Sequence, residues 1–143
     1  MSENMFAHTD LTGSIIKAYY RIYNELGYGF LEKVYENAMC IALNKLSLTV
    51  VQQAKINVYF DDEVVGEYAA DLLVNDLVII ELKATRTLNP DHEAQLLNYL
   101  KATQYEVGLL LNFGTKAEFK RKAFSNQRKG SLSWTQRSSK RKT

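Results

Sequence analysis

The chain has 143 residues, 46% of them hydrophobic and 24% charged, which is typical of one soluble domain with its own core. Its single cysteine, Cys40, excludes a disulfide framework and indicates a reducing, cytoplasmic compartment. The first ten residues are polar and no apolar run approaches the roughly 18 residues of a membrane span, so we expect neither a secretion signal nor a membrane partner.

Two helices and three strands are predicted in the first part of the chain. Apolar residues recur at helical spacing over residues 10–26, where Gly27 provides a stop, and again over residues 31–46. Residues 50–60 and 64–74 are rich in Val, Ile and Tyr and are separated by an acidic turn, which indicates a hairpin. A further strand, residues 77–84, follows a turn-forming Asn-Asp pair.

One helix and two strands complete the expected domain. Asn89 is a suitable N-cap with Pro90 in the first helical position, so a helix should run from residue 90 to about residue 103. Residues 105–113 and 116–124 are expected to be strands, and the helix would return the chain so that the first of them lies parallel to a neighbour. The predicted fold is therefore α/β, with a mixed sheet covered by helices on its faces.

The net charge of +2 conceals an uneven distribution along the chain. Residues 1–114 contain 8 Lys or Arg and 15 Asp or Glu, whereas residues 115–143 contain 10 basic residues and one acid. We therefore divide the chain into a domain of residues 1–124 and a flexible basic tail of residues 125–143. The basic end favours nucleic acid as a partner, although a tail that only aids solubility would carry the same charge. The candidate nucleic-acid-binding residues are Lys120, Arg121, Lys122, Arg128 and Lys129.

An unusual group of charged residues lies within the apolar strands. Asp71 falls in one predicted strand, and Glu81 and Lys83 fall in the next. Buried charges are costly when unpaired, so two repelling carboxylates need a cation between them, and Lys83 can serve only one. A hard divalent cation with oxygen ligands would solve this problem. The simpler alternative is a buried salt bridge to Lys83, with the second acid at the edge of the sheet.

The turn between the two strands decides whether one metal ion can contact both acids. With a two-residue turn at residues 75–76, Asp71 would pair with Ile80 and would face away from Glu81. A three-residue loop at residues 75–77, or a bulge near Asp71, would place Asp71 opposite Glu81 instead. A shared metal site therefore requires this odd offset.

Three further residues have a spacing that suits the charged group. Gln95 and Tyr99 are four residues apart, so they share one face of the predicted helix 90–103. Glu32 lies in the first turn of the predicted helix 31–46, directly after a glycine loop. Taken singly, a Gln and a Tyr at this spacing are usually surface and core residues, and an early Glu usually only meets the helix dipole.

Taken in order, these residues resemble a known signature. Asp71, the Glu-Leu-Lys segment 81–83, and Gln95 with Tyr99 are similar to the D…(D/E)xK…QxxxY pattern of the PD-(D/E)XK nuclease superfamily, in its exonuclease-like branch. The one departure is Ala70, which stands where the superfamily's name has proline, and that proline is often absent. The segment GFLEKVY at residues 29–35 also resembles the signature of the GxxExxY proteins, a small-domain family within the superfamily.

The resemblance covers roughly residues 8–124 and implies a restriction-endonuclease-like fold, in which a mixed β-sheet is flanked by helices. It also implies hydrolysis of phosphodiester bonds with Mg²⁺ or Mn²⁺. Asp71 and Glu81 would bind the metal with help from the backbone carbonyl of Leu82. Glu32 would add a ligand or hold a water on the metal.

The same resemblance assigns the catalytic roles. Lys83 would orient the attacking water, help to deprotonate it and offset charge in the transition state. A lysine suits this role because an ammonium can exchange a proton, whereas a guanidinium cannot. Gln95 and Tyr99 would position Lys83 or the scissile phosphate.

The expected function is a metal-dependent nuclease that acts on nucleic acid, with DNA favoured and RNA left open. A homodimer would place two sites on a duplex, although the sequence identifies no interface. One alternative is a nucleic-acid-binding module that keeps the fold without turnover, but inactive copies usually lose one of Asp71, Glu81 and Lys83. The other alternative is an interaction domain that docks through the basic tail and Trp134.

Overall fold

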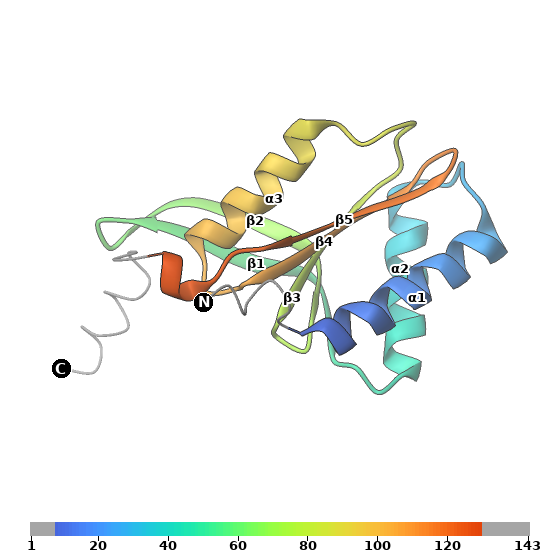
Figure 1. Cartoon of the computed structure of the whole chain (residues 1–143), viewed down its shortest axis with the longest axis horizontal. Coiled ribbons are helices and arrows are strands. Elements are labelled where there is room, and N and C mark those ends of the chain that lie inside the picture. The colour runs from blue at the N-terminus through green and yellow to red at the C-terminus, as the bar shows by residue number, and fades with distance from the viewer. Residues whose placement is uncertain (1–7, 130–143) are drawn as a thin grey trace.

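The structure, a computed structural model, describes residues 8–129 of the chain, which form one sheet with helices on both faces (Figure 1). The helices are α1 (Thr9–Leu26), α2 (Glu32–Lys45) and α3 (Pro90–Ala102). The strands are β1 (Val50–Phe60), β2 (Glu63–Val74), β3 (Val78–Lys83), β4 (Val107–Phe113) and β5 (Ala117–Ala123). All eight elements were predicted, and each observed boundary lies within two residues of the expected one.

The five strands lie in the order β1-β2-β3-β4-β5. Strands β3 and β4 are parallel, and the other three neighbouring pairs are antiparallel. Helix α3 connects the two parallel strands, as expected from its place between them in the sequence. The predicted mixed sheet with helices on its faces is confirmed. Within residues 8–129, no helix combines the length and the apolar character needed to cross a membrane.

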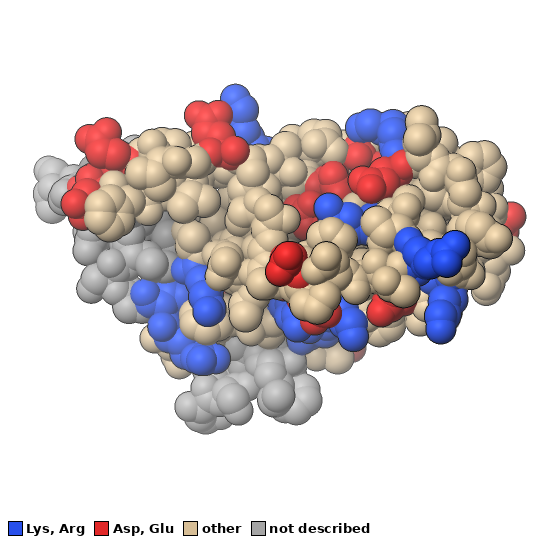
Figure 2. Space-filling view, turned by 90° about the horizontal axis from the view of Figure 1, so that it is seen from above, with Lys and Arg blue, Asp and Glu red and all other residues tan. Residues whose placement is uncertain are grey.

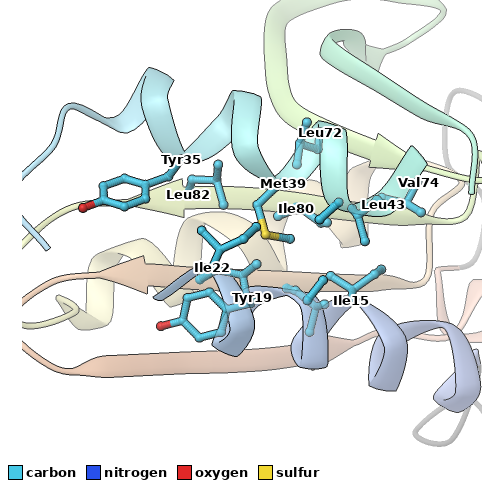
Figure 3. Packing of buried hydrophobic residues seen from close by; sticks show 14 of the residues in the cluster. Ile15, Tyr19, Ile22, Tyr35, Met39, Leu43, Leu72, Val74, Ile80 and Leu82 are labelled. Atoms are coloured by element: carbon cyan, nitrogen blue, oxygen red, sulfur yellow. The ribbon is translucent and has the colours of Figure 1, made fainter. Parts of the chain in front are cut away.

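Helices α1 and α2 cover one face of the sheet, where most of the core lies. Both helices repeat large apolar residues every three to four positions, so each presents one stripe to the strands. Each fully buried side chain of this size contributes roughly 1.5–3 kcal/mol to stability. Figure 3 shows Ile15, Tyr19 and Ile22 of α1 and Tyr35, Met39 and Leu43 of α2 packed with Leu72, Val74, Ile80 and Leu82 of the sheet.

Helix α3 covers the opposite face of the sheet (Figure 1). Leu96 and Leu100 of this helix belong to a second buried cluster that includes Ile79 of β3. Successive side chains of a strand face opposite sides, so Glu81 and Lys83 lie on the same face as Ile79. The sheet therefore directs both charged side chains of β3 toward the α3 side.

The β2–β3 hairpin has the odd offset that a shared metal site requires. Its last ladder pair before the turn joins Val74 to Val78, which leaves residues 75–77 as a three-residue loop. Asn75 and Asp76 both have positive φ, near 53°, a conformation that Asn and Asp adopt more readily than most residues. The register places Asp71 opposite Glu81 when it is extended by one pair beyond Leu72 and Ile80.

The described part of the predicted tail differs from the flexible segment that we expected. Ser125 is buried, and residues 126–128 form a single 3₁₀ turn. The Lys129 ammonium is buried and donates hydrogen bonds to the carbonyls of Thr103 and Tyr105, both at 2.7 Å. Composition alone predicted a solvated chain here, but these backbone acceptors hold the segment on the domain. Trp134 and the rest of the predicted tail lie outside the described residues.

Candidate active site

Asp71 lies at the point where β2 and β3 separate. Beyond the pair Leu72–Ile80, the Asp71 carboxylate accepts the backbone N–H of Leu82 at 2.7 Å. Its other oxygen accepts the side-chain amide of Gln53 at 3.2 Å. Hydrogen bonds to an ionised carboxylate are stronger than those between neutral groups, so the two donors hold Asp71 against β3.

Gln53 connects Asp71 to helix α2. Its backbone has φ 50°, in the left-handed region that residues other than glycine rarely adopt, and the β1–β2 ladder is interrupted at this point. The same amide that bonds Asp71 also donates to Glu36 at 2.8 Å, and Glu36 is only 4% exposed. Strained backbone of this kind is concentrated at functional sites. Neither Gln53 nor Glu36 carried a signal in the sequence.

Glu81 has a carboxylate oxygen that is buried and without a partner. Its Oε2 has no hydrogen-bond partner within residues 8–129. Burial raises the pKa of Glu81 to about 8; the nearby charges of Asp71 and Glu32 add to the rise, and that of Lys83 opposes it. A buried charge without compensation is unfavourable, and such perturbed groups cluster at functional sites. This carboxylate would gain from a cation.

The donor atoms near Glu81 fit a hard divalent cation. Asp71 and Glu81 supply carboxylate oxygens, and Leu82 supplies a backbone carbonyl between Glu81 and Lys83. Among the described residues, no group of three or more His, Cys, Asp or Glu side chains is close enough to hold a metal ion. Mg²⁺ keeps several waters and is usually bound through one or two carboxylates, so a pair is sufficient. Ligation by Asp71, Glu81 and the Leu82 carbonyl stays a prediction, and so does direct ligation by Glu32.

Lys83 follows Glu81 by two residues on the same face of β3. Its charge lowers the pKa of Glu81, which indicates that the ammonium lies near the carboxylate. Lys83 is partly exposed, and it forms no ion pair with any residue in the range 8–129. The simpler alternative of a buried salt bridge to Lys83 is therefore not what the structure shows.

Helix α3 and strand β2 each bring one aromatic ring to the Glu81 side of the sheet. Burial and the charge of Glu81 raise the pKa of Tyr99, and a hydrogen bond from Gln95 opposes the rise. The Tyr99 ring stacks on Tyr68 of β2, with centroids 3.5 Å apart and planes 13° from parallel. The Tyr68 hydroxyl is buried without a hydrogen-bond partner in the described chain. Sequence reasoning missed Tyr68, whose only signal was its position three residues before Asp71.

Glu32 is presented by a loop that Tyr35 fixes. The Tyr35 hydroxyl donates to the carbonyl of Gly27 at 2.8 Å and accepts the N–H of Phe30 at 3.2 Å. Gly29 has φ 111°, which only glycine adopts readily. The glycine and the tyrosine of the GFLEKVY segment therefore shape the loop, and the glutamate between them begins α2.

Asn112 of β4 holds the backbone of the segment that follows Lys83. Asn112 is fully buried, and its side chain accepts the N–H of Thr85 at 3.0 Å and donates to the Thr85 carbonyl at 2.9 Å. A Cβ on Gly114 would lie 1.9 Å from that carbonyl oxygen, so only glycine fits there. Asn112 was missed because its partner lies 27 residues away in the sequence.

The basic residues of β5 do not share one face of the sheet. Lys120 pairs with Leu110, which lies in the cluster under α3, and Lys122 forms an ion pair with Glu93 of α3 at 2.9 Å. Arg121 alternates to the other face, where it donates to Thr12 of α1 at 3.4 Å. Figure 2 shows Lys and Arg side chains in several separate groups on the face seen there.

The two basic residues after β5 have different environments. The Arg128 guanidinium is exposed and lies over the Phe124 ring, 4.4 Å from its centroid, and the Lys101 ammonium lies 5.5 Å from the same centroid. The Lys129 ammonium instead donates its hydrogen bonds to backbone carbonyls, as described above. Of these two residues, only Arg128 has a cationic group exposed to solvent.

One family model matches the chain over residues 9–122, and its description is the PD-(D/E)XK nuclease superfamily. The matched range runs from α1 to β5 and includes Asp71, Glu81, Lys83, Gln95 and Tyr99. Together with the mixed sheet and its flanking helices, the match confirms the predicted restriction-endonuclease-like α/β fold. No curated protein matches the chain.

Proposed function

Since the chain belongs to the PD-(D/E)XK nuclease superfamily, we propose that it is a metal-dependent nuclease that hydrolyses phosphodiester bonds of DNA. The observation that carries the proposal is the buried, unpartnered Glu81 oxygen beside Asp71 and Lys83. A structural salt bridge would have left this oxygen paired. A site that receives a cation and a phosphate leaves it open.

Mg²⁺ or Mn²⁺ would be held by the carboxylates of Asp71 and Glu81, with the carbonyl of Leu82 as a further oxygen ligand. When bound, such an ion lowers the pKa of a water and polarises a phosphoryl oxygen. The protein contributes two preformed features. The Leu82 N–H and the Gln53 amide hold the Asp71 carboxylate in place, and burial keeps Glu81 in a low-dielectric setting.

Lys83 supplies the side-chain cation of the proposed site. Phosphoryl transfer depends mainly on positioning and on stabilising charge at the phosphoryl oxygens. The Lys83 ammonium is partly exposed and carries no ion pair within residues 8–129, so it is available to the scissile phosphate and to the attacking water. Tyr99, which is stacked on Tyr68, and Gln95, one turn earlier on α3, would position the substrate from the α3 side.

We also infer that the chain belongs to the GxxExxY group within the superfamily. This inference is supported by the positive φ of Gly29 and by the Tyr35 hydroxyl, which ties together the loop before Glu32. In this arrangement Glu32 lies close enough to raise the pKa of Glu81, so its carboxylate belongs to the electrostatic field of the site.

A digestion panel tests the proposal. Single-stranded, duplex and branched DNA, and matched RNA, would be incubated with Mg²⁺ or Mn²⁺ and with EDTA. We expect cleavage that requires the metal and that Glu81→Gln and Lys83→Ala both abolish. Glu63→Gln, an exposed acid at the β1–β2 hairpin, is the matched control and should cut normally.

Two results would contradict the proposal. If Glu81→Gln cuts as fast as the parent at equal purity, the site assignment is wrong. If the parent binds these polymers but cuts none of them with either metal, the chain is a binding module that has kept the nuclease fold.

A further inference from the structure

A cleft of about 510 Å³ opens beside the proposed active site. The α1–α2 loop, the chain after β3 and the β4–β5 turn line it, and Figure 1 places these segments at one end of the molecule. Glu32 lines the cleft, and so does Ala84, which directly follows Lys83. Glu32 is therefore shared by the cleft and the group of residues to which we assign the chemistry.

The α1–α2 loop exposes large apolar side chains at the rim of this cleft. Tyr28 is 60% exposed, Phe30 is 48% exposed and Leu31 is 81% exposed. Scattered apolar residues are normal on a surface, but a contiguous group beside a cleft marks a binding site. The loop is also well fixed, because the Tyr35 hydroxyl bonds its backbone and the Tyr35 ring meets Phe30 edge-on at 6.0 Å.

Arg86 adds an exposed cation to the same cleft. A guanidinium binds phosphate oxygens in a fork and also stacks on planar groups. Aromatic faces combined with a cation are the usual means of binding unpaired nucleotides, since the bases stack on the rings and the backbone meets the positive charge. A duplex offers no free base face, so only a single strand, a frayed end or an extruded base could use these rings.

We propose that this cleft holds an unpaired base next to the scissile phosphate, so that the protein prefers single-stranded nucleic acid to duplex. The inference rests on the proposed nuclease function and specifies its substrate class. Tyr28 and Phe30 provide the stacking surface, and Arg86 meets the phosphate that flanks the base.

Binding can be measured by fluorescence anisotropy in the Glu81→Gln background, with a single-stranded oligonucleotide and the duplex of the same sequence. Base–aromatic stacking changes affinity by about 5- to 150-fold per base, so Tyr28→Ala and Phe30→Ala should each weaken single-strand binding within that range. Affinity for the duplex should not change. Phe60→Ala is the matched control, because Phe60 is 65% exposed at the distant β1–β2 hairpin and should have no effect.

Abasic substitution identifies the base. Each nucleotide of the single strand would be replaced in turn by an abasic unit. One position should reproduce the loss caused by Tyr28→Ala, and the variant should lose nothing further there. If no position does so, or if Tyr28→Ala and Phe30→Ala behave like Phe60→Ala, the cleft assignment is wrong.

The wild-type cleavage rates separate this inference from the proposed function. Faster cutting of the single strand supports both. Equal or faster cutting of the duplex overturns the base-binding cleft but leaves the nuclease proposal standing. If no polymer is cut or bound, both are overturned.

Discussion

Replacement of Glu81 by glutamine should remove the pH dependence of stability that its burial imposes on the metal-free protein. The pKa of Glu81 rises from an ordinary value of 4.5 to about 8 in the folded state. Below pH 4.5 the group is neutral whether the chain is folded or unfolded, so it costs nothing. As the pH rises from 4.5 to 8, only the unfolded chain ionises, and the free energy of unfolding falls.

The size of this effect follows from the two pKa values. Each unit of difference corresponds to 1.36 kcal/mol, which gives about 5 kcal/mol as an upper value once the pH exceeds 8. Water entry and relaxation around the carboxylate reduce the cost, so we expect roughly 2–5 kcal/mol. This is a large share of the roughly 5–15 kcal/mol that stabilises a typical domain.

Urea unfolding in EDTA at pH 5 and pH 8.5 measures the effect. The parent should lose this stability between the two pH values, whereas Glu81→Gln should not, so the variant should be the more stable protein at pH 8.5. Glu63→Gln, at an exposed position, should follow the parent. If the parent and Glu81→Gln show the same pH dependence, the Glu81 carboxylate is solvated and the main support for the metal site is lost.

Three further pairs of variants test other assignments made from the structure. Gly114→Ala should lower the free energy of unfolding by more than about 3 kcal/mol, because its Cβ would overlap a backbone oxygen. Gly13→Ala in α1 has open space and should be neutral or stabilising by up to about 1 kcal/mol. Urea unfolding measures both changes. Gln53→Gly should be more stable than Gln53→Ala by about 1 kcal/mol in the same assay, since only glycine adopts φ 50° without strain, and equal stabilities would refute the strain. Arg128→Ala should flatten the slope of log affinity for nucleic acid against log salt concentration by about 0.7–0.9. Lys129→Met should leave this slope unchanged but lower the free energy of unfolding by roughly 1–3 kcal/mol, because two buried carbonyls lose their donor. The reverse pattern would contradict the environments assigned to the two residues.

The elements of this fold were predictable because apolar spacing is a local property. The period of the buried residues, Gly27 after α1 and Asn89 before α3 were sufficient to place all three helices. The turn sequence alone did not determine the register between β2 and β3. The turn sequence allowed two offsets, and only the requirement that Asp71 meet Glu81 selected the three-residue loop that the structure contains.

The supporting contacts of the site were not predictable because they join distant parts of the chain. Gln53 reaches Glu36 across 17 residues, and Asn112 reaches Thr85 across 27. Neither contact produces a periodic pattern in the sequence, since a single polar residue in a strand has many possible partners. The prediction that Lys129 is solvated was wrong, although a lysine in a basic, polar segment normally remains in solvent.

The parallel pairing of β3 with β4 has a consequence for how the chain is made. Asp71 and Glu81 belong to one hairpin, so a growing chain can bring them together as soon as residue 83 has emerged. Strand β4 begins only at Val107, and until it emerges the other edge of β3 has no partner. Val78, Ile79 and Ile80 make that edge strongly apolar, and uncovered apolar edges pair with other chains. A nascent chain that pauses before β4 would thus hold both carboxylates in register while it is most prone to aggregate.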